Sequence, residues 1–309
     1  MKNPIKNLCL LFLAALCSCT GQKSGTPVDA GTQTYSYKDS CRHLVLSLSL
    51  ELPQGTDNAS LQISDSLIAD FIQNARRPGY DAEDTLGIAP YTDGWENPQA
   101  IVDHYGKASY AYLLRQAKAD YEARMQYLEE DSSITAEERE LFTEYAPQWS
   151  FEFNLTRGTD TPDFVVYHSQ AYIYLGGAHG GVAGSGDLTF DKHSGQKVSC
   201  FITPTSAHAL QPLLRKGLLQ YYKEAGDEMT DRQLSERLQI EGEQIPLPNN
   251  PVCPNATGDS LVFTYGQYEI ACYADGMPSF LLAVQDLLPY LTPEGKALLT
   301  KEQTTPKST

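Results

Sequence analysis

The sequence predicts an α+β protein, because strand-like and helix-like segments do not alternate regularly along the chain. Residues 44–52 and 149–156 alternate apolar with polar side chains, which is typical of strands that bury one face. Between these two stretches, an apolar pattern of helical period runs from about residue 97 to residue 128. The irregular order of strand-like and helix-like segments along the whole chain therefore favours α+β over a doubly wound α/β fold.

Helix starts are marked by residues that satisfy free backbone N–H groups. Asn97-Pro98 joins a capping side chain to a proline in the first turn, which is typical of a helix entry. The spacings Thr135-x-x-Glu138 and Thr230-x-x-Gln233 match capping boxes. Ser64 is expected to cap an earlier helix. The remaining expected elements are strands at 164–167, 171–175, 188–190, 197–202, 260–265 and 268–273, a turn at 191–195, and a helix at 207–224.

The N-terminus has the pattern of an export signal. Two lysines precede a nine-residue apolar run at 8–16, which is too short to span a bilayer. The sequence Leu16-Cys17-Ser18-Cys19 then matches a bacterial lipoprotein cleavage site, although an ordinary secretory signal is the alternative. We expect residues 1–18 to be the signal peptide, Cys19 to carry the lipid, and the Gly/Ser/Thr-rich residues 19–36 to form a flexible tether.

The charge balance and the absence of familiar motifs exclude several functions. The net charge is −16 and the pI is about 4.7, which argues against nucleic acid and against docking of the folded body on anionic lipid. Membrane association is therefore expected through the lipid only. The sequence has no nucleophile elbow, P-loop, dinucleotide fingerprint or H-E-x-x-H motif. His179 and His193 lack a third ligand at metal-like spacing, so we expect no metal and no cofactor.

Four cysteines remain in the expected mature chain besides Cys19, namely Cys41, Cys200, Cys253 and Cys272. Export places them where disulfides persist, and four cysteines allow three pairings that the sequence does not separate. Buried free thiols are the alternative.

Two runs rich in glycine and tyrosine are the candidate binding segments. Residues 172–181 place four glycines and His179 after a strand, and residues 265–276 end in an Asp-Gly turn. We expect the two runs to lie close together at one surface depression, although packing and tight turns explain the same residues without a ligand. The ligand-binding candidates are Tyr174, Gly176, Gly177, His179, Gly180, Tyr265, Tyr268, Tyr273, Asp275 and Gly276.

In this order, the runs resemble the extracellular domain of RsiV-type anti-sigma factors and the region preceding the catalytic domain of PdaC-type peptidoglycan deacetylases. That domain is known as domain of unknown function 3298, often preceded by a 4163-like domain, and the resemblance covers about residues 35–299. It implies a two-layer α/β sandwich as the N-terminal domain, over 37–180, and a mixed α/β domain with antiparallel strands over 181–300. A polar tail at 301–309 follows. Cys272 stands where the family more often has proline, and Cys200 where an aliphatic residue is usual, so an added disulfide is expected.

The resemblance also implies recognition at the cell wall, since RsiV-type proteins bind lysozyme there. We therefore expect a lipid-anchored, periplasmic or surface-exposed envelope protein that binds a cationic protein such as lysozyme or a cell-wall glycan, without catalysis. The alternatives are a peptidoglycan- or glycan-acting hydrolase or deacetylase-associated protein, which needs two converging carboxylates or His179 beside an acid, and a non-catalytic envelope scaffold.

Overall fold

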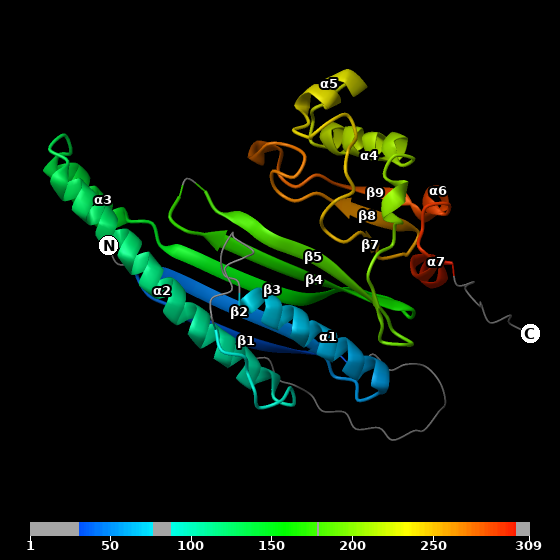
Figure 1. Cartoon of the computed structure of the whole chain (residues 1–309), viewed down its shortest axis with the longest axis horizontal. Helices are drawn as coiled ribbons and strands as arrows, with labels where there is room; N and C mark the ends of the chain where they lie inside the picture. The colour runs from blue at the N-terminus through cyan, green and yellow to red at the C-terminus, as the bar shows by residue number, and fades with distance from the viewer. Residues whose placement is uncertain (1–30, 77–87, 178, 301–309) are drawn as a thin grey trace, which may run out of the picture.

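The computed structural model describes residues 31–76, 88–177 and 179–300 and confirms the α+β fold (Figure 1). A six-stranded sheet with the order β1-β2-β3-β4-β5-β6 forms the larger part. Strands β2 and β3 run parallel and every other neighbouring pair is antiparallel. The strands are β1 (Thr32–Ser40), β2 (Leu44–Pro53), β3 (Trp149–Asp160), β4 (Phe164–Tyr174), β5 (Gly181–Asp191) and β6 (Lys197–Val198).

Three helices connect the parallel strands β2 and β3, as such a crossover requires. They are α1 (Asn58–Ala75), α2 (Pro98–Glu130) and α3 (Ala136–Tyr145). Figure 1 shows α1 and α2 across one face of the sheet, with α3 at the end of α2 that projects past the strands. The first hydrophobic core lies between this face and the helices. Strand β2 contributes every second residue to it, from Leu44 to Leu52, as the sequence alternation predicts.

A second, smaller unit follows β6 and packs beside β5 (Figure 1). Its antiparallel sheet has the order β7-β8-β9. The strands are β7 (Cys253–Pro254), β8 (Ser260–Thr264) and β9 (Ser279–Ala283). The helices are α4 (Gln211–Glu224), α5 (Asp231–Arg237), α6 (Val284–Leu287) and α7 (Pro293–Leu299), with short 3-10 turns η1 (Pro204–Ser206) and η2 (Tyr273–Asp275). Among the described helices, none is long and apolar enough to cross a bilayer.

Strand β4 belongs to both hydrophobic cores. Val165 and Tyr167 point into the core beneath the helices, whereas Phe164 and Val166 point into the core of the second unit. Because side chains alternate along a strand, one strand serves both cores with its two faces. The two units are therefore joined by shared packing and not only by the chain.

The structure moves two of the expected boundaries. Residues 32–36, which we assigned to the tether, form the first part of β1, because each of them pairs with β2 in register. The expected boundary between residues 180 and 181 falls inside the six-stranded sheet, since β5 pairs with β4. The expected signal peptide, Cys19, most of the tether and the polar tail lie outside the described residues.

Local signals gave mixed results. Asn97, Thr135 and Thr230 cap helices as predicted, the latter two with complete capping boxes. Ser64 does not cap α1, because Asp57 accepts the backbone N–H of Ser60 and starts the helix earlier. The two strands expected at 164–167 and 171–175 are one continuous strand, β4, and the helix expected from residue 207 starts at Gln211 after a 3-10 turn.

Candidate binding site

The glycine-rich run forms the connection from β4 to β5. Gly176 has a φ of +75°, a left-handed conformation that favours glycine, and a Cβ atom there would lie 3.0 Å from Trp149 Nε1. A Cβ atom at Gly180 would lie 2.9 Å from the carbonyl oxygen of Ile173 and would also meet the Tyr172 hydroxyl. At Gly177 an added Cβ would meet nothing within 4 Å. Two of these glycines are therefore required by the backbone path, and Gly177 is not.

The tyrosine-rich run is a tight loop, so the strand expected at 268–273 was wrong. The Glu269 carboxylate accepts the backbone N–H groups of Gly266 and Asn249, both at 2.6 Å, which closes the loop on itself. Tyr268 adopts a φ of +61°, and η2 completes the loop. Side-chain acceptors that bind nearby N–H groups compete with strand pairing, and here they replace it.

These two runs meet in space. We call Tyr172, His179, Tyr268 and Tyr273 the aromatic cluster. The His179 and Tyr273 rings stack with centroids 3.9 Å apart, and the Tyr268 hydroxyl lies 3.4 Å from His179 Nε2. The Tyr273 hydroxyl donates to the carbonyl of Gly180 at 2.9 Å. Residues about 90 positions apart in the chain thus form one surface, as the sequence analysis expected.

The cluster leaves aromatic area open to solvent. Tyr268 is 58% exposed and Tyr172 is 40% exposed. Tyr172 reaches this surface because it lies on the face of β4 opposite the helices, in register with Val182 of β5. The sequence analysis included Tyr172 in the run but did not single it out as a binding residue, because only the pairing of β4 with β5 places its ring beside Gly180.

Several sequence candidates have structural roles instead. Asp275 is 8% exposed and binds Arg237, whose Nε lies 3.0 Å from Oδ1, and this pairing lowers the pKa of the carboxyl. Tyr265 is fully buried, with its hydroxyl donating to the Pro246 carbonyl at 2.8 Å. Gly276 adopts a left-handed φ of +70° at the end of η2. These contacts give Asp275 and Tyr265 structural roles, and Gly276 forms the turn that ends η2.

Tyr174 is half-buried at the end of β4, where it pairs in register with Ser150, and it is not among the rings of the cluster. Ala178 lies outside the described residues.

All four described cysteines are free, so the expected disulfide is not present in the structure. Each of the four thiols has a different set of neighbouring groups, and none of the contacts below joins one cysteine to another. Cys200 donates to the Ile202 carbonyl, Cys253 to the Asp187 carboxylate at 3.0 Å, and Cys272 to Asp275 at 3.6 Å. Cys41 packs against the first core. Each thiol thus has local partners of its own.

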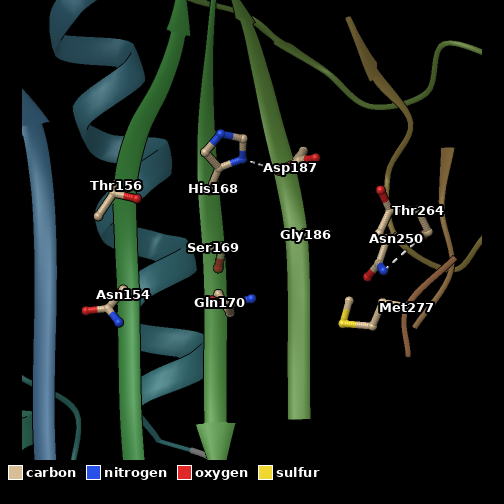
Figure 2. Close-up of a pocket in the computed structure, with 10 residues that line it drawn as sticks. All are labelled: Asn154, Thr156, His168, Ser169, Gln170, Gly186, Asp187, Asn250, Thr264 and Met277. Carbon is tan, nitrogen blue, oxygen red and sulfur yellow. Dashed lines mark hydrogen bonds and ion pairs between the residues drawn. The ribbon is translucent and has the colours of Figure 1, made fainter. Parts of the chain in front are cut away.

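A cavity of about 360 Å³ lies between β3–β5 and the second unit (Figure 2), and we call it the polar cavity because most of its lining residues are polar. The sequence analysis missed it. Its lining residues are Asn154, Thr156, His168, Ser169, Gln170, Gly186, Asp187, Asn250, Thr264 and Met277. Polar residues at every second position of β3 and β4 could have indicated the cavity. The sequence does not show, however, that the second unit packs over this outer face of the sheet.

A chain of three side chains borders the cavity. His168 Nδ1 lies 2.5 Å from Asp187 Oδ1, and the Cys253 thiol donates to the other carboxylate oxygen. The hydrogen bond to Asp187 raises the pKa of His168. Burial, followed by the Asp187 charge, raises the pKa of the Cys253 thiol. A nucleophilic cysteine needs a lowered pKa, so Cys253 is placed here as a hydrogen-bond donor.

Comparisons with known proteins agree with this architecture. Residues 202–284 match the family described as "Protein of unknown function (DUF3298)", which confirms the expected domain over these residues. A DUF3298 family structure from Bacteroides fragilis NCTC 9343 is 19% identical, with 88% of this chain and 98% of that one covered and a TM-score of 0.59. One from Pseudomonas aeruginosa PAO1 is 13% identical, with coverage of 85% and 95% and a TM-score of 0.51. These identities show a shared fold only. A comparison with curated proteins found no match.

Proposed function

We propose that this chain, whose residues 202–284 form a DUF3298 domain, is a lipid-anchored binding protein of the bacterial cell envelope. Its contact surface is the aromatic cluster, and its partner is a cell-wall-associated protein such as lysozyme or a cell-wall glycan. The N-terminal lipoprotein pattern around Cys19 supports the location. The resemblance to RsiV-type and PdaC-type extracellular domains supports recognition at the wall.

The observation that carries the proposal is the backbone of Tyr268. Among the described residues it is the only non-glycine with a positive φ, and its ring is 58% exposed. A left-handed tyrosine costs about 1–3 kcal/mol and persists only where surrounding bonds hold it. Here the Glu269 carboxylate provides those bonds through Gly266 and Asn249. A strained, exposed aromatic residue that is held in place is typical of a contact residue.

The negative charge of this protein would attract a cationic partner at long range and would contribute little to direct contact at the aromatic cluster. The two acids of the loop, Glu269 and Asp275, are already engaged by backbone N–H groups and by Arg237. The net charge of −16 would still draw a cationic protein toward the molecule. Direct contact would then depend on the rings, which offer rigid area at low cost in entropy, and stacking on sugars would use the same rings.

The test compares Tyr268→Gly with Tyr127→Ala in a binding measurement against immobilised hen lysozyme and against a peptidoglycan digest. Glycine removes the ring and also relieves the left-handed backbone, so the variant should remain folded. Tyr127 is 61% exposed on α2, on the helix side of the sheet, whereas Tyr172 of the cluster lies on the opposite face, so Tyr127 is the matched control. We expect Tyr268→Gly to weaken binding about tenfold, equivalent to about 1.4 kcal/mol, and Tyr127→Ala to leave it unchanged.

The ionic strength of the buffer distinguishes the two partners. Binding to lysozyme should weaken as salt rises from 0.05 to about 0.5 M, because exposed charges are screened within about 8–10 Å. Binding to neutral glycan fragments should hardly change. The proposal would be refuted if neither partner bound the wild type, or if Tyr268→Gly bound as tightly as the wild type.

A further inference from the structure

The polar cavity is built from the outer face of the large sheet. Asn154 is in register with Gln170, and Thr156 is in register with His168, so four polar side chains form two adjacent cross-strand pairs. Figure 2 shows these strands on one side of the cavity, with Asn250, Thr264 and Met277 of the second unit on the other. The volume of about 360 Å³ is near the lower end of the range of roughly 300–1,000 Å³ for small-molecule sites.

The charges of the lining compensate one another. No lysine or arginine is among its residues, and its one carboxylate belongs to Asp187. One oxygen of that carboxylate bonds to His168 and the other accepts the Cys253 thiol. An anion would meet the Asp187 carboxylate and no lysine or arginine, with His168 already bonded to that carboxylate, and an ammonium group would find no open carboxylate. The cavity is suited to a neutral ligand.

The amide groups are the main hydrogen-bonding features on the sheet side. The side chains of Asn154 and Gln170 make no hydrogen bond with other protein groups in the part of the chain that the structure describes. An amide both donates and accepts, which matches hydroxyl and acetamido groups. Met277 adds an apolar contact on the opposite wall. Paired amides, threonine hydroxyls and one apolar side chain fit the hydroxyl groups and the C–H surface of a sugar ring.

We propose that the polar cavity binds a neutral sugar of about one ring, with Asn154 and Gln170 as its hydrogen-bonding residues. This site is separate from the aromatic cluster and does not depend on the function proposed above. Gln170 and Tyr172 nevertheless lie two residues apart on the same face of β4, roughly 7 Å along the strand. A sugar in the cavity would therefore lie beside the cluster.

The experiment is saturation-transfer NMR on the whole chain with three probes of similar size, namely N-acetylglucosamine, glucose and the anion gluconate. The variants are Asn154→Ala and Gln170→Ala, and the matched control is Gln62→Ala, an exposed amide on α1. We expect transfer to at least one neutral sugar and not to gluconate. Each cavity variant should raise the Kd about tenfold or more, whereas Gln62→Ala should leave it unchanged.

Thermal melting of each variant checks the fold, since both amides lie on the outer face of the sheet and their truncation should not lower the Tm. The proposal is overturned if the folded wild type shows no transfer to either neutral sugar, or if gluconate binds equally well. It is also overturned if the cavity variants bind like the wild type. Tyr268→Gly should bind these single sugars as tightly as the wild type does. A wrong proposal about the aromatic cluster can therefore be distinguished from a wrong proposal about the polar cavity.

Discussion

The buried pair of Arg237 and Asp275 makes an asymmetric prediction about stability. The Asp275 side chain is 3% exposed, whereas that of Arg237 is 36% exposed and also binds Asp227. Arg237→Ala leaves a buried carboxylate without its counter-ion, which costs about 3–5 kcal/mol when the burial is complete. It also removes the guanidinium that lies 4.6 Å from the Tyr222 ring centroid, worth about 0.5–1 kcal/mol.

Asp275→Ala should cost less, although it removes the more buried partner. The guanidinium keeps Asp227 and part of its solvent contact, so the loss is limited to charged hydrogen bonds worth about 1.5–3 kcal/mol. We therefore expect Arg237→Ala to lower the free energy of unfolding by at least about 0.5 kcal/mol more than Asp275→Ala does. Urea denaturation followed by circular dichroism at pH 7 measures both values.

The pH dependence gives a second measurement on the same variants. Arg237 lowers the pKa of Asp275, so the stability from this pair is present above the unfolded carboxyl pKa of about 4 and is lost as the pH falls through the folded pKa. In Arg237→Ala the buried carboxyl takes up a proton more readily. The gap between wild type and variant should thus narrow from pH 7 to pH 4. An equal gap at both pH values, or a larger cost for Asp275→Ala, would refute the reasoning.

Three further predictions concern other parts of the chain. Gly180→Ala should lower the free energy of unfolding by about 1–3 kcal/mol, because its Cβ has no room, whereas Gly177→Ala should change it little; thermal melts of the two compare them directly. His168→Ala should destabilise the protein by about 0.2–1 kcal/mol near pH 6. That cost should shrink toward pH 9, because the bond to Asp187 raises the pKa of His168 and its contribution is lost as the pH rises through the folded value; a cost that grew with pH would contradict this. A fatty-acid analogue fed to expressing cells should label the wild type and not Cys19→Ala, and equal labelling of both would exclude lipidation there.

Hydrophobic periodicity predicted the amphipathic elements, and capping residues predicted where helices begin. The alternating leucines of β2 lie in the core, and Thr135 and Thr230 start helices, because in each case the signal and its physical cause lie within a few residues. The strand expected at 268–273 did not form. There the carboxylate of Glu269 binds backbone groups from both sides of the loop, and a bond to Asn249, 20 residues away, does not appear in a local pattern.

The sequence analysis named three of the four residues of the aromatic cluster, His179, Tyr268 and Tyr273, because glycine and tyrosine content pointed to both runs. It did not name Tyr172, whose place depends on strand pairing. The partner of Asp275 lies 38 positions earlier in the chain, so no local pattern marked that acid as structural. The polar cavity needs the second unit to pack on β4 and β5, which is a property of the tertiary fold.

The dual packing of β4 has a consequence for how the chain is divided experimentally. A fragment limited to the DUF3298 match, residues 202–284, would lack Phe164 and Val166 and would expose the apolar surface that these two side chains cover. Conversely, a fragment ending before residue 202 would expose Phe164 and Val166 to water. Each fragment thus lacks part of a shared hydrophobic core. Heat or denaturant should therefore unfold residues 31–300 in one cooperative transition. Limited proteolysis should not release a folded fragment.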